Sequence, residues 1–176
     1  DNNMNEVIKC LVERRSIKSF QSKMVEDEKI NEIVKAGMYA PTAMNLQSPN
    51  IIVITNEETK KEIRNKNCEI MGNYNIDPFH NAPVIILVIA KNTPTAVYDG
   101  SCVIDNMLNA AYSLGLGACW IHRAKEEMES DFGKKILAKL GLEGDYVGIG
   151  HVAVGYPEGD IPKTKLRKEN YVYYIK

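Results

Sequence analysis

The amino-acid sequence predicts an α+β fold in one domain that spans residues 1–176. Apolar residues recur at helical spacing in several segments, and continuous β-branched runs lie between those segments. Because the runs are far apart in the chain, they do not form a β-meander, and we expect helices between them. An apolar content of 44% and a charged content of 26% are typical of a folded globular protein.

The N-terminal part of the chain predicts two amphipathic helices. In the first, the apolar residues at positions 4, 7, 8, 11 and 12 form one face. In the second, Ile30, Ile33 and Val34 repeat this spacing, and the acidic residues before them favour a helix N-terminus. Pro41 ends the second helix, since a residue before proline avoids the helical conformation.

Two β-branched runs predict buried strands in the first half of the chain. The runs 51–54 and 84–90 are continuous and apolar, as expected of strands buried on both faces. Between them, residues 56–66 predict a helix with Asn56 as its cap, and residues 72–83 have the composition of a loop.

The second half predicts the longest helix and the remaining strands. The helix over residues 95–116 is apolar on more than one face, which indicates burial at the centre or in a subunit interface. The segment "GLGACWIH" predicts a turn and a short strand. The other expected elements are a helix over 128–140 closed by Gly141, a strand over 146–156 and a strand-like tail over 171–175.

Charge and composition exclude several classes of function. Lys and Arg number 22 and Asp and Glu 23, so no excess charge favours nucleic acid or an anionic membrane surface. No apolar run approaches the roughly 20 residues that span a bilayer. The four cysteines form no C-x-x-C pair, which favours reduced thiols in a cytoplasmic protein. The N-terminus does not have the pattern of a signal peptide.

Two short motifs are present but lack the context that their function requires. Gly148, Gly150 and Ala153 fit G-x-G-x-x-A, but they lie in a strand-like run, so no helix N-terminus follows to meet a pyrophosphate. Cys119-x-x-His122 lacks a second ligand pair, so we expect no metal site. No nucleophile elbow or P-loop is present. The remaining histidines, His80 and His151, are interpreted as isolated, satisfied or surface residues.

Two basic clusters suggest a phosphate clamp. "ERRSIKSF" brings basic residues together over 14–18 after the first helix, and Lys163, Lys165 and Arg167 lie in the tail. A purely structural interpretation of the first cluster is a solvated helix C-terminus, where positive charges interact favourably with the helix dipole. Two arginines from separate segments would instead grip one phosphate group in a bidentate way.

The segment "APTAMNLQSPN", residues 40–50, is rich in amide and hydroxyl side chains. Asn and Gln each offer a donor and an acceptor, so they suit a planar ring with alternating polar atoms. Together with a phosphate clamp, this loop would suit flavin mononucleotide (FMN).

Four motifs in order, "RRSIK", "APTAMNLQ", "GLGACWI" and "GYP" with "KTKLR", resemble the FMN-dependent nitroreductase family. The resemblance spans residues 5–174. It implies a nitroreductase-like fold with a central mixed β-sheet flanked by helices, in an intertwined homodimer with FMN at each subunit interface. It also implies that the loop near residue 45 comes from the partner subunit, and that the helix over 95–116 is the dimer helix.

The resemblance also implies the cofactor-binding residues. They form three groups. The first group binds the phosphate, the ribityl chain and the N1/O2 edge of the flavin ring. The second group is the loop that lies against the flavin, and the third group runs past the reactive edge of the ring. These residues are Arg14, Arg15, Ser16, Lys18, Lys165 and Arg167; Pro41, Thr42, Ala43, Asn45 and Gln47; and Trp120, Ile121 and His122. No side chain is expected to act as a catalytic acid, base or nucleophile.

The implied activity is hydride transfer from NAD(P)H to flavin N5, followed by reduction of a nitroaromatic, a quinone or a related substrate in a ping-pong mechanism. The alternatives are a flavin carrier or sensor without turnover, and an interaction domain without cofactor. The sequence departs from the family pattern at Thr42, where serine is usual, at Asn50, where an aromatic residue is usual, and at His122, where a small or acidic residue is common.

Overall fold

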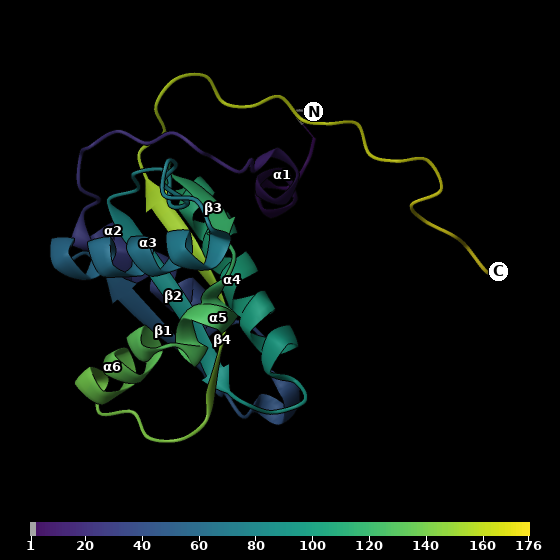
Figure 1. Cartoon of the computed structure of the whole chain (residues 1–176). Coiled ribbons are helices and arrows are strands. Elements are labelled where there is room, and N and C mark those ends of the chain that lie inside the picture. The colour runs from purple at the N-terminus through teal and green to yellow at the C-terminus, as the bar shows by residue number, and fades with distance from the viewer. Residues whose placement is uncertain (1–2) are drawn as a thin grey trace.

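The computed structural model describes residues 3–176, so the first two residues of the predicted domain lie outside the described part. A four-stranded sheet carries helices on both faces (Figure 1). Within residues 3–176, no helix combines the length and apolarity that a membrane span requires. The elements are α1 Glu6–Glu13, α2 Asp27–Met38, the 3-10 turn η1 Ala43–Asn45, β1 Pro49–Ile54, α3 Glu57–Met71, β2 Val84–Lys91, α4 Ala96–Ser113, β3 Gly117–Ile121, α5 Ala124–Glu129, α6 Asp131–Leu140 and β4 Tyr146–Gly155.

The strands lie in the order β1-β2-β4-β3, and every pair of neighbours is antiparallel. This corrects the mixed sheet that the resemblance implies. The reason is the connection: α3 and the loop after it return the chain to the end where β1 stops, so Ile54 pairs with Ile85 at the start of β2. In the described residues, parallel pairing occurs only as the isolated bridge between Ser16 and Ala118.

The central strand β2 explains why the sheet has helices on both faces. Ile86 and Val88 point into the core formed with α2 and α4, whereas Ile85 and Leu87 point into the core formed with α3, α5 and α6. All residues from Val84 to Ala90 are buried, which confirms the predicted buried strand. Alternate side chains of β2 therefore pack into two apolar cores, one on each face of the sheet.

Three sequence predictions of elements are wrong. β1 is only half-buried, because it is an edge strand, and Val53 is exposed. The predicted helix 128–140 is two helices, because α6 turns back so closely on α5 that a side chain at Gly133 would collide with the carbonyl of Met128. The tail 171–175 forms no strand, since no strand of the described chain lies beside it to pair with.

The first helix has an apolar face, as predicted, but this face is not buried in the chain. In α1, Val7 is 65% exposed and Leu11 is 50% exposed, and no residue of the helix is buried. The longest helix buries one face against α2 and the sheet, while Val97 and Tyr98 on another face are exposed. Exposed apolar side chains on α1 and α4 are typical of an interaction surface.

Candidate FMN site

The segment after α1 is extended and runs beside the edge of the sheet. The amide of Ile17 donates to the carbonyl of Ala118 in β3 (3.0 Å), and the amide of Gln21 donates to the carbonyl of Tyr156 just after β4 (2.9 Å). Ile17 is buried so tightly that a Cβ on Gly117 would lie 2.7 Å from its side chain. These contacts fix the register of residues 14–21 against the sheet.

Because alternate residues of an extended segment share one side, Arg14, Ser16 and Lys18 lie opposite the buried Ile17. All three act on the thiol of Cys119 in β3. Burial raises the pKa of the Cys119 thiol, whereas the charge of Lys18, the side chain of Ser16 and the charge of Arg14 lower it. The structure thus brings two cations, Arg14 and Lys18, and the hydroxyl of Ser16 near one thiol, and we call these three residues the basic face.

Arg15 lies apart from the basic face. Its guanidinium donates to the carbonyls of Val12 and Arg14, each at 2.8 Å, and so binds carbonyls at the C-terminal end of α1. A basic side chain at a helix C-terminus is favourable both as a donor and as a charge. This geometry indicates a structural task for Arg15, on the side opposite to Arg14, Ser16 and Lys18.

His80 is half-buried in the loop 72–83, near enough to Lys18 for the charge of Lys18 to affect it. Burial lowers the pKa of His80, and the positive charge of Lys18 lowers it further, while Asp77 opposes the shift. Asp77 holds the loop by accepting from the amides of Phe79 (2.8 Å) and Asn81 (2.9 Å), and His80 and Asn81 both have positive φ. Asp77 is thus the residue that shapes the turn in this loop, as an aspartate often does.

The amide-rich loop is strained and closed on itself. Met44, Asn45 and Gln47 have φ values of 52°, 53° and 53°, which non-glycine residues seldom adopt and which cluster at functional sites. The hydroxyl of Thr42 accepts from the amide of Gln47 (3.0 Å), and the Gln47 side chain donates to Asn45 (3.1 Å). The hydroxyl of Thr42 therefore closes the loop on itself, and the loop is preorganised.

Asp99, which is buried in the first turn of α4, anchors this loop. Its carboxylate accepts from the amide of Ala43 (2.9 Å) and from the hydroxyl of Thr95 (3.1 Å). Sequence reasoning missed Asp99, although it is an acidic residue on an otherwise apolar face of the longest helix. Beside the loop, Thr42 and Gln47 line a cavity of about 320 Å³ between α2, β1 and α4.

The loop and the basic face lie far apart in one chain. Asp99 holds the loop at the start of α4, and Ala118, which pairs with Ser16, follows the end of that helix. The helix has 18 residues, so it separates the two groups by about 25 Å. Figure 1 shows α4 running between the loop after α2 and the strand β3. A single subunit therefore does not bring the two predicted parts of the site together.

The third predicted group lies at the end of β3. Trp120 is half-buried and covers Gly150, where a Cβ would lie 2.8 Å from the indole ring; Ile121 is buried, and His122 is exposed. Cys119 and His122 thus differ in exposure. Among the described residues, no three His, Cys, Asp or Glu side chains are grouped as metal ligands.

The two basic tail residues do not reach the basic face. Lys165 and Arg167 are exposed, and Arg167 donates to Thr164 within the tail (3.5 Å). The tail runs away from the sheet as an extended chain (Figure 1). The predicted phosphate clamp is therefore not assembled in an isolated subunit.

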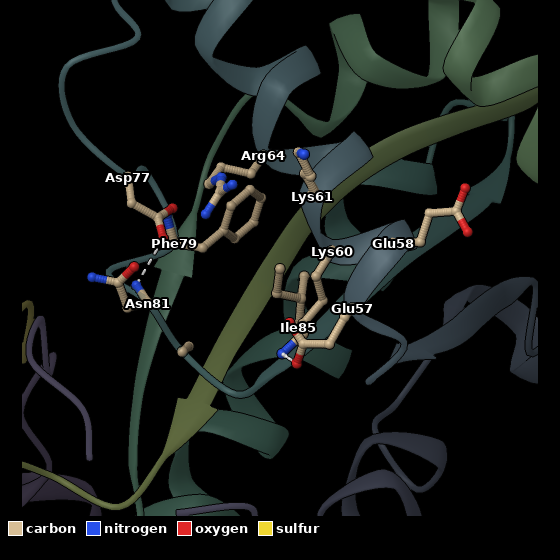
Figure 2. Close-up of a pocket in the computed structure, with 10 residues that line it drawn as sticks. Glu57, Glu58, Lys60, Lys61, Arg64, Asp77, Phe79, Asn81 and Ile85 are labelled. Carbon is tan, nitrogen blue, oxygen red and sulfur yellow. Dashed lines mark hydrogen bonds and ion pairs between the residues drawn. The ribbon is translucent and has the colours of Figure 1, made fainter. Parts of the chain in front are cut away.

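A separate cavity of about 460 Å³ lies between α3 and the loop 77–82, and Figure 2 shows its lining. Lys60 binds Glu57 (2.8 Å) and the carbonyl of Pro83 (3.1 Å), so its charge is already compensated. The lining carries charges of both signs and contains none of the residues predicted to bind FMN. We therefore do not assign the cofactor to this cavity.

The chain matches the model of the Nitroreductase family over residues 11–156, and it belongs to that family. A protein of Archaeoglobus fulgidus, provisionally named NADH dehydrogenase/NAD(P)H nitroreductase, is 30% identical over 163 aligned positions, and the match covers 89% of this chain and 88% of the relative. The FMN reductase (NADPH) of Bacillus subtilis is 25% identical over 188 aligned positions, and the match covers 97% of this chain and 74% of the relative.

A solved structure of a nitroreductase with bound FMN from Bacteroides fragilis has the same fold. It is 26% identical to this chain, with a TM-score of 0.87, and the match covers 98% of this chain and 100% of that one. A nitroreductase from Desulfitobacterium hafniense has the same TM-score of 0.87 at 22% identity and supports the fold alone. The α+β, nitroreductase-like fold predicted from the sequence is confirmed by these likenesses.

Proposed function

We propose that the protein is an FMN-dependent oxidoreductase that takes hydride from NAD(P)H and reduces nitroaromatic, quinone or related electron-poor substrates. The observation that carries this proposal is the basic face of Arg14, Ser16 and Lys18 beside β3, in a member of the Nitroreductase family. Relatives named NAD(P)H nitroreductase and FMN reductase, and a structural neighbour with bound FMN, support it.

Bound FMN would supply the redox chemistry at its N5 atom, first as hydride acceptor and then as donor in a ping-pong cycle. Arg14 and Ser16 would hold the phosphate and the ribityl chain. Lys18 would lie at the pyrimidine edge of the ring, where reduction places negative charge, and would raise the reduction potential by stabilising that charge. The exposed side chain of His122 would border the space for the substrate.

We also propose that the active form is a homodimer. The strained loop and the basic face lie at opposite ends of α4, so a loop from the partner would complete each site. The exposed apolar residues of α1, and Tyr173 and Ile175 in the tail (80% and 103% exposed), support burial of these surfaces against a second subunit. In such a dimer the tail would bring Lys165 and Arg167 to a phosphate.

The test of the activity is the visible absorption spectrum of the purified protein, recorded anaerobically before and after NADPH and NADH. We expect a yellow protein that releases FMN on denaturation, bleaches with one or both nucleotides, and regains its colour with a nitro compound. A yellow protein that neither nucleotide bleaches would instead favour a flavin carrier or sensor. A protein that stays colourless after incubation with FMN would refute the proposal.

The test of the dimer is sedimentation at micromolar concentration. We expect a dimer for the wild-type protein, and a shift toward monomer for Leu11→Asp, because a charge would be buried on the apolar face of α1. Ile76→Asp is the matched control, since Ile76 is 55% exposed in the loop after α3. A wild-type monomer that retains FMN would contradict the shared site.

A further inference from the structure

Three fully buried polar side chains form a hydrogen-bonded chain between β4, α5 and α3. Nε2 of His151 lies 2.6 Å from Oε1 of Glu127, and the other carboxylate oxygen accepts from Nδ2 of Asn67 at 2.8 Å. All three residues are 0% exposed, and the ring of Phe79 packs edge-on against His151 at 5.0 Å. None of them belongs to the predicted FMN-binding residues.

The partners of this network determine where its hydrogens lie. Nδ1 of His151 carries a hydrogen, because its partner is the carbonyl of Ile121 at 2.7 Å. A proton also lies between His151 and Glu127, since two lone pairs would repel at that separation. The Asn67 amide cannot be turned over, because both of its close partners, Glu127 and the carbonyl of His122 (2.9 Å), are acceptors.

The network contributes less to the stability of the core than apolar side chains would. Buried ionisable groups lose their hydration, and apolar residues of similar volume often replace such groups without loss of stability. One polar atom, Oδ1 of Asn67, is buried without any hydrogen-bond partner. A task beyond packing would explain why these side chains occupy the centre of the molecule.

Both ends of the network bind the backbone where β3 ends. His151 donates to the carbonyl of Ile121, and Asn67 donates to the carbonyl of His122. The next residue, Arg123, has a φ of 76°, and its carbonyl accepts from the amide of Glu127 (3.1 Å). Three successive peptide units are therefore held by the network and by the helix that carries Glu127.

We propose that His151, Glu127 and Asn67 are positioning residues that fix the backbone of residues 121–123 against the flavin. This inference rests on the proposed function, in which Trp120, Ile121 and His122 pass the reactive edge of FMN. The network acts from behind β3: it orients two carbonyls and so sets the direction of the peptide units between them. A shift of about 1 Å in such a segment can slow a reaction by up to about 10²-fold.

The experiment replaces Asn67 by leucine, whose side chain has the same branched shape, is somewhat larger and cannot donate to the carbonyl of His122. We expect Asn67→Leu to bind FMN and to reduce it at least about tenfold more slowly than the wild type, at saturating NADPH or NADH in stopped flow. Asn65→Leu is the matched control, because Asn65 is exposed on the same helix. It should keep the wild-type rate. Should Asn67→Leu not fold, Asn67→Ala removes the same donor without adding bulk.

A graded pair at Glu127 separates positioning from packing. In Glu127→Gln the amide nitrogen can donate to Nε2 of His151 while the amide oxygen accepts from Asn67, so every hydrogen bond has a replacement. We expect Glu127→Gln to recover most of the rate of FMN reduction that Glu127→Leu loses.

The outcomes distinguish this inference from the proposed function. A wild-type protein without flavin would overturn both. If the wild type is reduced by NAD(P)H, and the folded, flavin-loaded Asn67 variant melts at a lower temperature but is reduced at the same rate, the network only stabilises the core. The positioning role is then wrong, and the proposed function is unaffected.

Discussion

Replacing Arg14 and Arg167 together by alanine is expected to weaken FMN binding by about 3–6 kcal/mol, since each charge-assisted hydrogen bond contributes about 1.5–3 kcal/mol. Arg14 lies on the basic face with Ser16 and Lys18, and Arg167 lies in the tail. A phosphate gripped from two sides loses both bidentate donors in the double variant. Titration of the apoprotein with FMN, followed by flavin fluorescence, measures the change.

The single variants show whether the tail takes part. In the isolated chain Arg167 contacts only the tail, so a loss of affinity in Arg167→Ala would mean that the tail folds over a bound phosphate. Lys168→Ala is the control, because Lys168 is an exposed tail cation outside the predicted clamp. Unchanged titration curves for the double variant would refute the clamp. A loss in Arg14→Ala alone would confine the phosphate site to the basic face.

The second large effect is expected at Gly148: its replacement by alanine should lower the free energy of unfolding by about 3 kcal/mol. A side chain there would collide with the carbonyl of Ala124, where α5 begins against β4. The strand does not yield easily here, because Gly148 pairs with Ile89 of the buried strand β2. Urea unfolding of the purified protein measures the loss.

The neighbouring Val147→Ala is the comparison for this variant. Val147 is only partly buried, and its truncation should cost about 1 kcal/mol. If Gly148→Ala is as stable as the wild type, the contact between α5 and β4 is not tight. The close packing also explains why a glycine occupies position 148 of the G-x-G-x-x-A pattern. Gly148 lies within a strand and allows α5 to approach β4, so dinucleotide binding is not needed to explain it.

Local patterns predicted most elements because each helix or strand has a characteristic apolar period. The spacing in α2, the β-branched run in β2 and the capping of α3 by Asn56 (2.9 Å to the amide of Thr59) all appear in the structure. The predictions for β1 and for residues 128–140 were wrong because they depended on neighbours. An apolar run does not reveal whether its strand lies at the edge of a sheet, and periodicity does not reveal that two helices meet at Ser130.

The residues of the candidate site also differ in whether the sequence could predict them. The basic face was predictable because residues 14, 16 and 18 alternate in one short segment. The role of Asp99 was not, because Asp99 accepts from the amide of Ala43 across 56 residues. Nor was the effect of the Lys18 charge on the pKa of His80, which lies in another loop. The buried network was still less visible, since His151, Glu127 and Asn67 come from three separate elements.

By itself, then, the sequence determined the α+β class, the positions of most elements and the candidate residues for a flavin phosphate, because these depend on short-range periodicity and on residue chemistry. Only the tertiary structure decided which of those residues meet. It gathered Arg14, Ser16 and Lys18, turned Arg15 to the other side, and set the amide-rich loop at the far end of α4. The physical reason is that such encounters depend on how the helices pack on the sheet, which no single segment encodes.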